Sequence, residues 1–140
     1  MGDFSTIRDG ILTTLRNNSN FTTANTAYFS AGLLETAPTR WAVVVSPGPI
    51  ELIHTSYGPS DSIREEYTFI LRLFIEVQTT DQLATDSVTV VEAMISAWET
   101  DVTLAASCNL SNLSLEAADI MDLFDKEWLM LEWRVVAISL

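Results

Sequence analysis

A chain of 140 residues has the size of one domain and is long enough to bury a single core. Apolar residues make up 48% and charged residues 19%, which excludes a disordered chain or a coiled coil, and no run approaches the roughly 18 consecutive apolar residues of a transmembrane helix. Nineteen acidic residues face seven basic ones, so the formal net charge is -12 and no cluster of lysine or arginine exists that would hold nucleic acid tightly.

The N-terminal segment is predicted to be helical. Its apolar residues recur at helical spacing, which predicts a helix from Asp3 to Asn17: Phe4, Ile7, Ile11 and Leu15. The polar segment 21–40 contains Gly32 and Pro38, and we expect it to be irregular apart from a short helical turn near Ala31–Leu34.

A hairpin is predicted next. The β-branched run Trp41–Val45 is followed by the turn residues Ser46–Pro49 and by a second apolar run, Ile50–His54. The polar connection Thr55–Arg64 then has two interpretations. It is either a plain surface loop or the tip of an extended β arm that covers residues 50–68.

The segment Glu65–Gln78 has the clearest strand pattern in the chain, and it is much longer than the five or six residues of an average strand. One predicted face is apolar and consists of Tyr67, Phe69, Leu71, Leu73, Ile75 and Val77. The other face is mixed and consists of Thr68, Ile70, Arg72, Phe74 and Glu76.

A second helix is predicted from Thr80 to Asp101. Three- and four-residue steps predict its buried face, namely Ala84, Val88, Val91, Ile95, Trp98 and Val102. Two strands follow, a short one at Leu113–Ala117 and a long one at Glu127–Ile138, and an acidic connection, Ala118–Lys126, joins them.

These elements predict a single α+β domain over residues 1–140. Their order is α-β-β-β-α-β-β, and short connections between successive strands favour a mainly antiparallel sheet flanked by the two helices.

The predicted sheet is apolar on both faces, whereas a sheet covered on one side normally has one polar face. Ile70 and Phe74 lie on the outer face of the long strand, and Trp128 and Met130 lie on the corresponding face of the last strand. Two helices cover one side, so either the sheet folds over on itself or a neighbouring subunit covers the second face. We expect the neighbouring subunit.

No residue pattern indicates catalysis, a cofactor or a metal site. His54 is the only histidine, and the chain contains no Gly-x-Ser-x-Gly, G-x-G-x-x-G or Walker sequence. Cys108 is the only cysteine and is expected to be buried, while Lys126 between Asp125 and Glu127 is expected to form an ion pair. We therefore expect a protein that is not an enzyme and needs no cofactor.

Acidic residues are densest at Asp119, Asp122 and Asp125. The residues between them are largely apolar and lack the central glycine of an EF-hand loop, so a solvated or partner-facing acidic loop is favoured over a calcium site.

The pattern of elements over nearly the whole chain resembles the tail terminator (tail completion) proteins of long-tailed bacteriophages. A helix and a proline-bearing connection lead to Trp41–Val45, a long strand containing Tyr67–Ile75 leads to a helix after Asp81, and an amphiphilic strand, Glu127–Val135, closes the chain. Members of that family form hexameric rings on the head-proximal end of the tail, where they stop growth of the tube and give the neck a docking surface.

The resemblance implies a structural virion protein that is assembled in the host cytoplasm. Its partners would be further copies of itself, the tail tube protein and a neck or head-completion protein, with DNA passing through the ring and no contact with a membrane. Subunit contacts are expected at His54, Tyr57 and Arg64 on the arm and at Ile70, Phe74, Trp128 and Met130 on the outer strand faces. The residues Asp119, Asp122 and Asp125 would face the channel or a neighbour.

Two alternatives remain open. One is another neck or head-completion adaptor protein, which would bind portal-containing heads rather than tail tubes. The other is a small ligand-binding α+β domain, which would be a closed monomer with a pocket of convergent polar groups.

Overall fold

The computed structural model describes residues 4–21, 27–29, 41–57 and 60–139, and for residues 41, 42, 46–57 and 60–64 it describes the backbone alone. The elements are α1 (Phe4–Arg16), β1 (Ala27–Phe29), β2 (Trp41–Tyr57), β3 (Ser60–Glu76), α2 (Thr80–Thr100), β4 (Leu110–Leu123) and β5 (Lys126–Ser139). The chain has an α+β fold.

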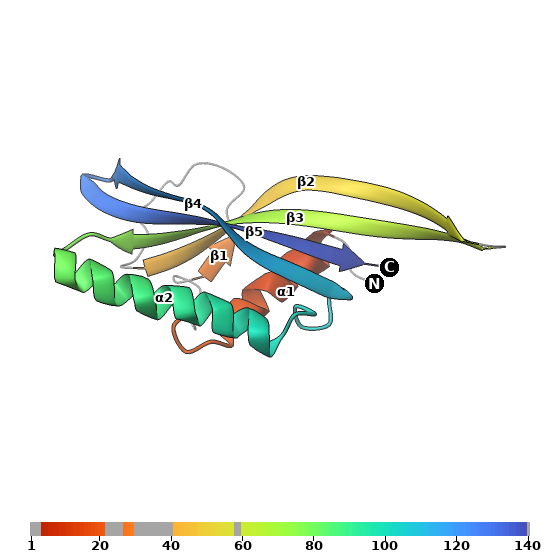
Figure 1. Cartoon of the computed structure of the whole chain (residues 1–140), viewed down its shortest axis with the longest axis horizontal. Helices are drawn as coiled ribbons and strands as arrows, with labels where there is room; N and C mark the ends of the chain where they lie inside the picture. Colours follow the sequence, from red (N-terminus) through yellow and green to blue (C-terminus); the bar gives the residue numbers. More distant parts are fainter. Residues whose placement is uncertain (1–3, 22–26, 30–40, 58–59, 140) are drawn as a thin grey trace.

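The strands form one sheet in the order β1-β2-β3-β5-β4. Only β1 and β2 run parallel within it, and the other neighbours are antiparallel. Figure 1 shows both helices on the same side of the sheet and two long hairpins, β2–β3 and β4–β5, that extend from the body in opposite directions.

The main core lies between the helices and the sheet, as the alternation in Glu65–Gln78 predicts. Tyr67, Phe69, Leu71, Leu73 and Ile75 of β3 are all buried there. The strand β5 pairs with β3 and contributes Leu131, Trp133, Val135 and Ala137 to the same face. Paired residues on one face of adjacent strands lie close enough to pack directly, so these two strands make the floor of the core.

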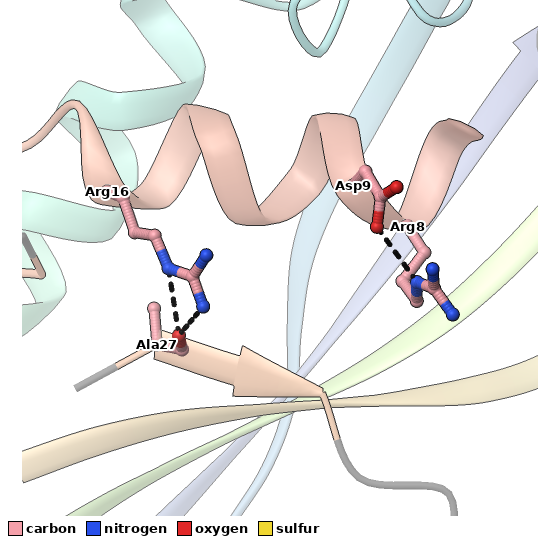
Figure 2. Close-up of polar contacts among 4 residues, drawn as sticks. All are labelled: Arg8, Asp9, Arg16 and Ala27. Atoms are coloured by element: carbon pink, nitrogen blue, oxygen red, sulfur yellow. Dashed lines mark hydrogen bonds and ion pairs between the residues drawn. The ribbon is translucent and has the colours of Figure 1, made fainter. Parts of the chain in front are cut away.

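The helix α1 packs as predicted. Ile7, Ile11 and Leu15 are fully buried, and the ring of Phe4 stacks on Phe69 with the centroids 4.9 Å apart. Close to its C-terminal end, Arg16 donates from Nε and Nη2 to the carbonyl oxygen of Ala27, at 3.1 and 2.7 Å (Figure 2). The helix thus holds the short edge strand β1 against the body.

The strand β1 was not predicted, because three residues are too few to give a recognisable alternation. It lies in the segment expected to be irregular. The helical turn expected near Ala31–Leu34 lies outside the described residues.

The prediction of a turn at Ser46–Pro49 is wrong. The strand β2 continues through this segment to Tyr57, and its register with β3 shifts between Pro47 and Ile50. Proline lacks the N–H that a ladder needs, so it is tolerated where one side of a strand is unpaired. The partner β1 reaches only Val45, and beyond that residue β2 is an edge strand of the described sheet.

The predicted face of α2 is confirmed at Trp98, which is buried, and at Val91, which packs against the core, and is wrong elsewhere. The helix begins after Thr79, whose Oγ1 accepts a hydrogen bond from Gln82 N. Its buried residues are Asp86, Val90, Ala93, Met94, Ala97 and Trp98, whereas Val88 and Ile95 are exposed. Apolar side chains occupy a wider arc of this helix than one face, so spacing alone did not identify the arc that the sheet covers.

The acidic connection predicted at Ala118–Lys126 is mostly strand. The strand β4 spans fourteen residues instead of five, and a bulge between Leu115 and Ala117 interrupts its pairing with β5. A two-residue turn, Phe124-Asp125, joins it to β5, with φ values of 53° and 61°. Positive φ at both positions is typical of type I′ turns, whose twist matches that of the adjoining strands.

Candidate functional site

The second face of the sheet has a small core of its own. Phe74, Trp128 and Met130, which we expected at a subunit interface, are 4%, 1% and 6% exposed in the isolated chain. They form a cluster with Val44, whereas Ile70 is half-buried and is not one of the residues packed against this cluster. The expectation that another chain must cover Phe74, Trp128 and Met130 is therefore wrong.

The length of β4 explains part of this closure. Met121 pairs with Trp128, and both Met121 and Leu123 pack against the cluster from the edge of the sheet, as does Tyr28 of β1. The indole Nε1 of Trp128 donates to the carbonyl oxygen of Leu123 at 3.0 Å. The sequence predicts a connection at residues 118–126, so these covering side chains are absent from the predicted sheet.

The β2–β3 hairpin is the extended arm that the sequence left as one of two alternatives. Tyr57 pairs with Ser60 at its end, and His54 pairs with Ile63 on the way. The strand β5, which pairs with the other side of β3, ends at Ser139 opposite Glu65. From Ile53 to Arg64 the arm is therefore a two-stranded ribbon. Of His54, Tyr57 and Arg64 the backbone is described, and their side chains lie outside the described part.

The acidic residues do not form one loop. Asp119 pairs with Met130 and so lies on the sheet face away from the helices, Asp122 pairs with Glu127, and Asp125 lies in the turn. All three are exposed. Within the described ranges, no group of histidine, cysteine or acidic residues is arranged to hold a metal ion. Nearby, Lys126 Nζ lies 3.3 Å from Glu76 Oε1, so this lysine is ion-paired as predicted, although with a different carboxylate.

A strained turn follows α2. Leu104, Ala105 and Ala106 have φ values of 52°, 57° and 62°, a left-handed conformation that costs a residue with a side chain about 1–2 kcal/mol. The carboxylate of Asp101 accepts hydrogen bonds from Thr103 N, Thr103 Oγ1 and Ala105 N. Desolvation raises the pKa of Asp101, but these hydrogen bonds together outweigh it and leave the pKa below its ordinary value.

Cys108 ends this turn and is buried, as predicted. Burial, assisted by the negative charge of Asp101, raises the pKa of the thiol. The Sγ atom lies 3.5 Å from the carbonyl oxygen of Thr103 and donates to it. A buried thiol with a raised pKa is a poor nucleophile, so the arrangement is structural.

A pocket of about 350 Å³ lies between the helices, at the end of α1. The residues that line it, all of polar type except Ala97, are Thr14, Asn17, Asn18, Ser19, Ser96, Ala97, Thr100 and Asp101. Among the described residues, Thr14 Oγ1 is buried without a hydrogen-bond partner. No local sequence pattern indicates this pocket, because its residues come from the ends of α1 and α2 and from the residues just after them, which lie far apart in the chain.

An apolar surface on α2 and on the edge strand β4 is also absent from the sequence-based expectations. Its large exposed side chains are Val88 and Ile95 of α2 and Leu115 and Ile120 of β4. Apolar residues occupy more of the circumference of α2 than one buried face requires, which was the available signal for this surface. Val88 and Ile95 were instead predicted to be buried.

No family model matches the sequence, and no curated protein matches it either. Among the helices of the described ranges, none is both long and apolar enough to span a membrane.

Proposed function

We propose that this protein is a non-catalytic assembly protein that joins copies of itself into a ring, like the phage tail terminators that its element pattern resembles. In this role it stops growth of the tail tube at the head-proximal end and presents a docking surface to a neck or head-completion protein. Its partners are then its own copies, the tail tube protein and the neck, and its place is the virion after assembly in the host cytoplasm.

The arm carries the proposal. Between Ile53 and Arg64 two strands extend beyond the third strand of the sheet, as Figure 1 shows at the end of the β2–β3 hairpin. An isolated two-stranded hairpin is marginally stable in water, whereas a third strand or a packed surface stabilises it. A neighbouring subunit that receives the arm would provide that surface, and repetition of the same contact around an axis closes a ring.

The charge is consistent with a channel for DNA. The formal net charge is -12, and Asp119, Asp122 and Asp125 are exposed. A lumen lined with carboxylates would repel the phosphate backbone, so DNA would pass without the counterion release that drives binding. Which residues line such a channel is part of the proposal.

The arm can be shortened without disturbing the body. Ile53 pairs with Arg64, so replacement of residues 54–63 by Asn-Gly closes the hairpin with a favoured two-residue turn and preserves the alternation of the ladder. Pairing of β3 with β5 begins at Glu65 and is unaffected. A matched control, His54→Ala, keeps the length of the arm and changes one side chain.

The test measures ring formation by light scattering and electron microscopy, with purified protein alone and with tail tubes added. We expect the full chain to form rings and cap the tubes, the shortened chain to remain a folded monomer, and His54→Ala to assemble. A full chain that stays monomeric in the presence of tubes, or a shortened chain that still forms rings, would contradict the proposal. Rings that bind portal-containing heads and ignore tubes would favour an adaptor role instead.

The pocket at the end of α1 supports a second candidate, a small ligand-binding domain. Its polar lining and the unpartnered hydroxyl of Thr14 are the kind of groups that orient a small polar ligand. A binding domain of this kind would remain monomeric with tail tubes present, and Thr14→Val would weaken ligand binding without affecting assembly. The same light-scattering experiment therefore separates the two candidates.

A further inference from the structure

The C-terminal ends of both helices lie at the pocket of about 350 Å³. The helix α1 contributes Thr14 of its last turn and the residues 17–19 that follow, and α2 contributes Ser96, Thr100 and its C-cap Asp101. Figure 1 shows these two ends beside one another. The backbone carbonyl groups at a helix C-terminus carry a partial negative charge. Two such charges therefore converge on the pocket.

A carboxylate adds a full negative charge to these partial ones. Among the described residues that line the pocket, Asp101 is the charged one. Although desolvation raises the pKa of Asp101, its hydrogen bonds from Thr103 and Ala105 lower the pKa by more, so the carboxylate is ionised near neutral pH. The donors of these bonds are neutral groups, so they leave the charge in place.

Basic residues are missing from the neighbouring sequence. Residues 17–39 and 73–125 contain no lysine, arginine or histidine, and they include every described lining residue except Thr14. Arg16 lies in the last turn of α1, but its guanidinium donates to the carbonyl oxygen of Ala27 on β1 (Figure 2). An anionic ligand would therefore meet no counter-charge in the described lining, whereas the helix ends attract a cation.

The oxygen atoms at the end of α2 are available as acceptors. Thr100 Oγ1 donates its single proton to the carbonyl oxygen of Ser96 at 2.9 Å, so this hydroxyl has only lone pairs left to offer a ligand. The ionised carboxylate of Asp101 is an acceptor as well. A primary ammonium group matches such a lining, because it has three donors and no acceptor.

Thr14 is an independent sign of a ligand. The residue is 2% exposed, and within the described ranges its Oγ1 has no hydrogen-bond partner. A threonine hydroxyl inside a helix can donate to the carbonyl group of the preceding turn, and a buried hydroxyl that makes no bond is unfavourable. A ligand in the pocket that donates to Thr14 Oγ1 would satisfy this atom.

The pocket is held open in the free chain by contacts between the helices. Asn18 Nδ2 donates to the carbonyl oxygen of Ala93 on α2 at 3.3 Å, and Asn18 Oδ1 accepts from Asn20 N at 2.9 Å. These bonds fix the end of α1 against α2. A preformed site loses less conformational entropy when its ligand binds.

The size of the pocket and its single carboxylate select the kind of cation. A volume of about 350 Å³ is that of a site for a small organic molecule and exceeds the need of a single ion. Calcium takes six to eight oxygen ligands, usually with several carboxylates. Within the described ranges no group of acidic, histidine or cysteine residues is arranged to hold a metal ion.

We propose that the pocket between the C-terminal ends of α1 and α2 binds a small organic cation through a primary ammonium group. The ammonium group is attracted by Asp101 and by the two helix ends, and it donates to the hydroxyl oxygen atoms of the lining. The inference gives a ligand chemistry to the pocket of the second candidate function, and it does not depend on ring formation.

The test is an NMR titration of the full chain at constant ionic strength with four compounds. Three share a four-carbon skeleton and differ in charge, namely n-butylammonium chloride, 1-butanol and sodium butyrate, and the fourth is potassium chloride. We expect n-butylammonium to bind saturably and to shift the amide signals of residues 14–19 and 96–101. We expect the other three compounds to bind at least about tenfold more weakly.

Charge changes at Ser96 locate the binding, because this lining residue is exposed and its replacement leaves the core intact. We expect Ser96→Asp to strengthen binding of n-butylammonium about twofold or more and Ser96→Lys to weaken it about fivefold or more. Thr85→Lys is the matched control, since Thr85 is an exposed residue of α2 three turns away. Its affinity should change by less than about twofold, because salt screens a charge at that distance.

Thr14→Val tests the unpartnered hydroxyl while keeping the shape of the side chain. We expect it to weaken binding of n-butylammonium about threefold or more, because one hydrogen bond to the ligand is lost. Without the amine, the variant should be at least as stable in urea as the parent, since the lost hydroxyl has no partner. Weaker binding by a chain of undiminished stability separates a ligand contact from a structural role.

The inference would be overturned if n-butylammonium showed no saturable binding, or if 1-butanol, butyrate or potassium bound as tightly. Signal shifts away from the pocket, or equal affinities of Ser96→Asp and Ser96→Lys, would overturn it as well. Ring formation is measured on variants of the β2–β3 arm, so either experiment can fail without affecting the other.

Discussion

The carbonyl oxygen of Leu104 lies against Gly10, so close that a Cβ atom added to the glycine would fall far inside van der Waals contact with it. The side chain of Ser107 closes the same space from beside it. The helix α1 therefore approaches the left-handed turn after α2 more closely than any larger residue permits at this position.

We expect Gly10→Ala to destabilise the fold by about 1–3 kcal/mol, despite the better helix propensity of alanine, because a backbone oxygen must move to accommodate the methyl group. The free energy of unfolding in urea measures this change. Thr13→Ala, at an exposed position of the same helix, is the control and is expected to be neutral or slightly stabilising. A Gly10→Ala chain as stable as the parent would show that the approach is looser than described.

Asp101 is expected to make stability depend on pH at the acidic end. Its pKa is lowered in the folded chain, so its contribution is present above the unfolded pKa of about 3.9 and is lost as the pH falls through the folded pKa. Asp101→Asn should remove this part of the acid dependence and cost about 1 kcal/mol near neutral pH, as loss of a cap does. Urea unfolding at a series of pH values tests both statements, with the exposed Asp81→Asn as control.

The cluster on the second face is expected to stabilise the monomer. Because Phe74 is buried among Val44, Trp128 and Met130 of its own chain, Phe74→Ala should cost about 3–5 kcal/mol of unfolding free energy in dilute protein. Phe124→Ala is the control, since Phe124 is exposed in the β4–β5 turn and its loss should have a small effect. If the Phe74→Ala monomer were as stable as the parent but failed to assemble, the prediction would be wrong and Phe74 would belong to a subunit interface.

The sequence predicted the elements whose pattern directly reflects burial. The alternation from Tyr67 to Ile75 gave β3 and the face that the helices cover, and the spacing of Ile7, Ile11 and Leu15 gave the packed face of α1. Both patterns have one buried face and one more exposed face, so the period alone identifies the element and its orientation.

The features that the sequence did not predict depend on contacts between segments that lie far apart in the chain. The tract Ser46–Pro49 has the composition of a turn, yet it continues a strand because one side of β2 is unpaired there. The strand β4 is largely exposed, so its sequence lacks the alternation that burial imposes. The predicted strand ended at Ala117, which left Met121 and Leu123 out of the sheet, and Trp128 and Met130 were therefore expected to need a second chain. The pocket at the end of α1 and the apolar surface on α2 and β4 both combine α2 with distant segments, which no local pattern reveals.

Cys108 reports on the left-handed turn, because it is the only cysteine of the sequence and it is buried at the end of that turn. Iodoacetamide should react with it slowly in the folded chain, since the pKa of the thiol is raised and its sulfur is covered, so that modification waits for local opening. The raised pKa also contributes stability that is present below the unfolded pKa of about 8.5 and lost as the pH rises through the folded value.

We expect Asp101→Asn to accelerate labelling of Cys108, because three hydrogen bonds that hold the turn depend on this carboxylate. Thr79→Ala is the matched control: it removes the N-terminal cap of α2, costs about 1 kcal/mol and leaves the turn intact. Labelling followed by mass spectrometry would contradict this account if the two variants reacted at the same rate, because opening would then be global rather than confined to residues 101–108.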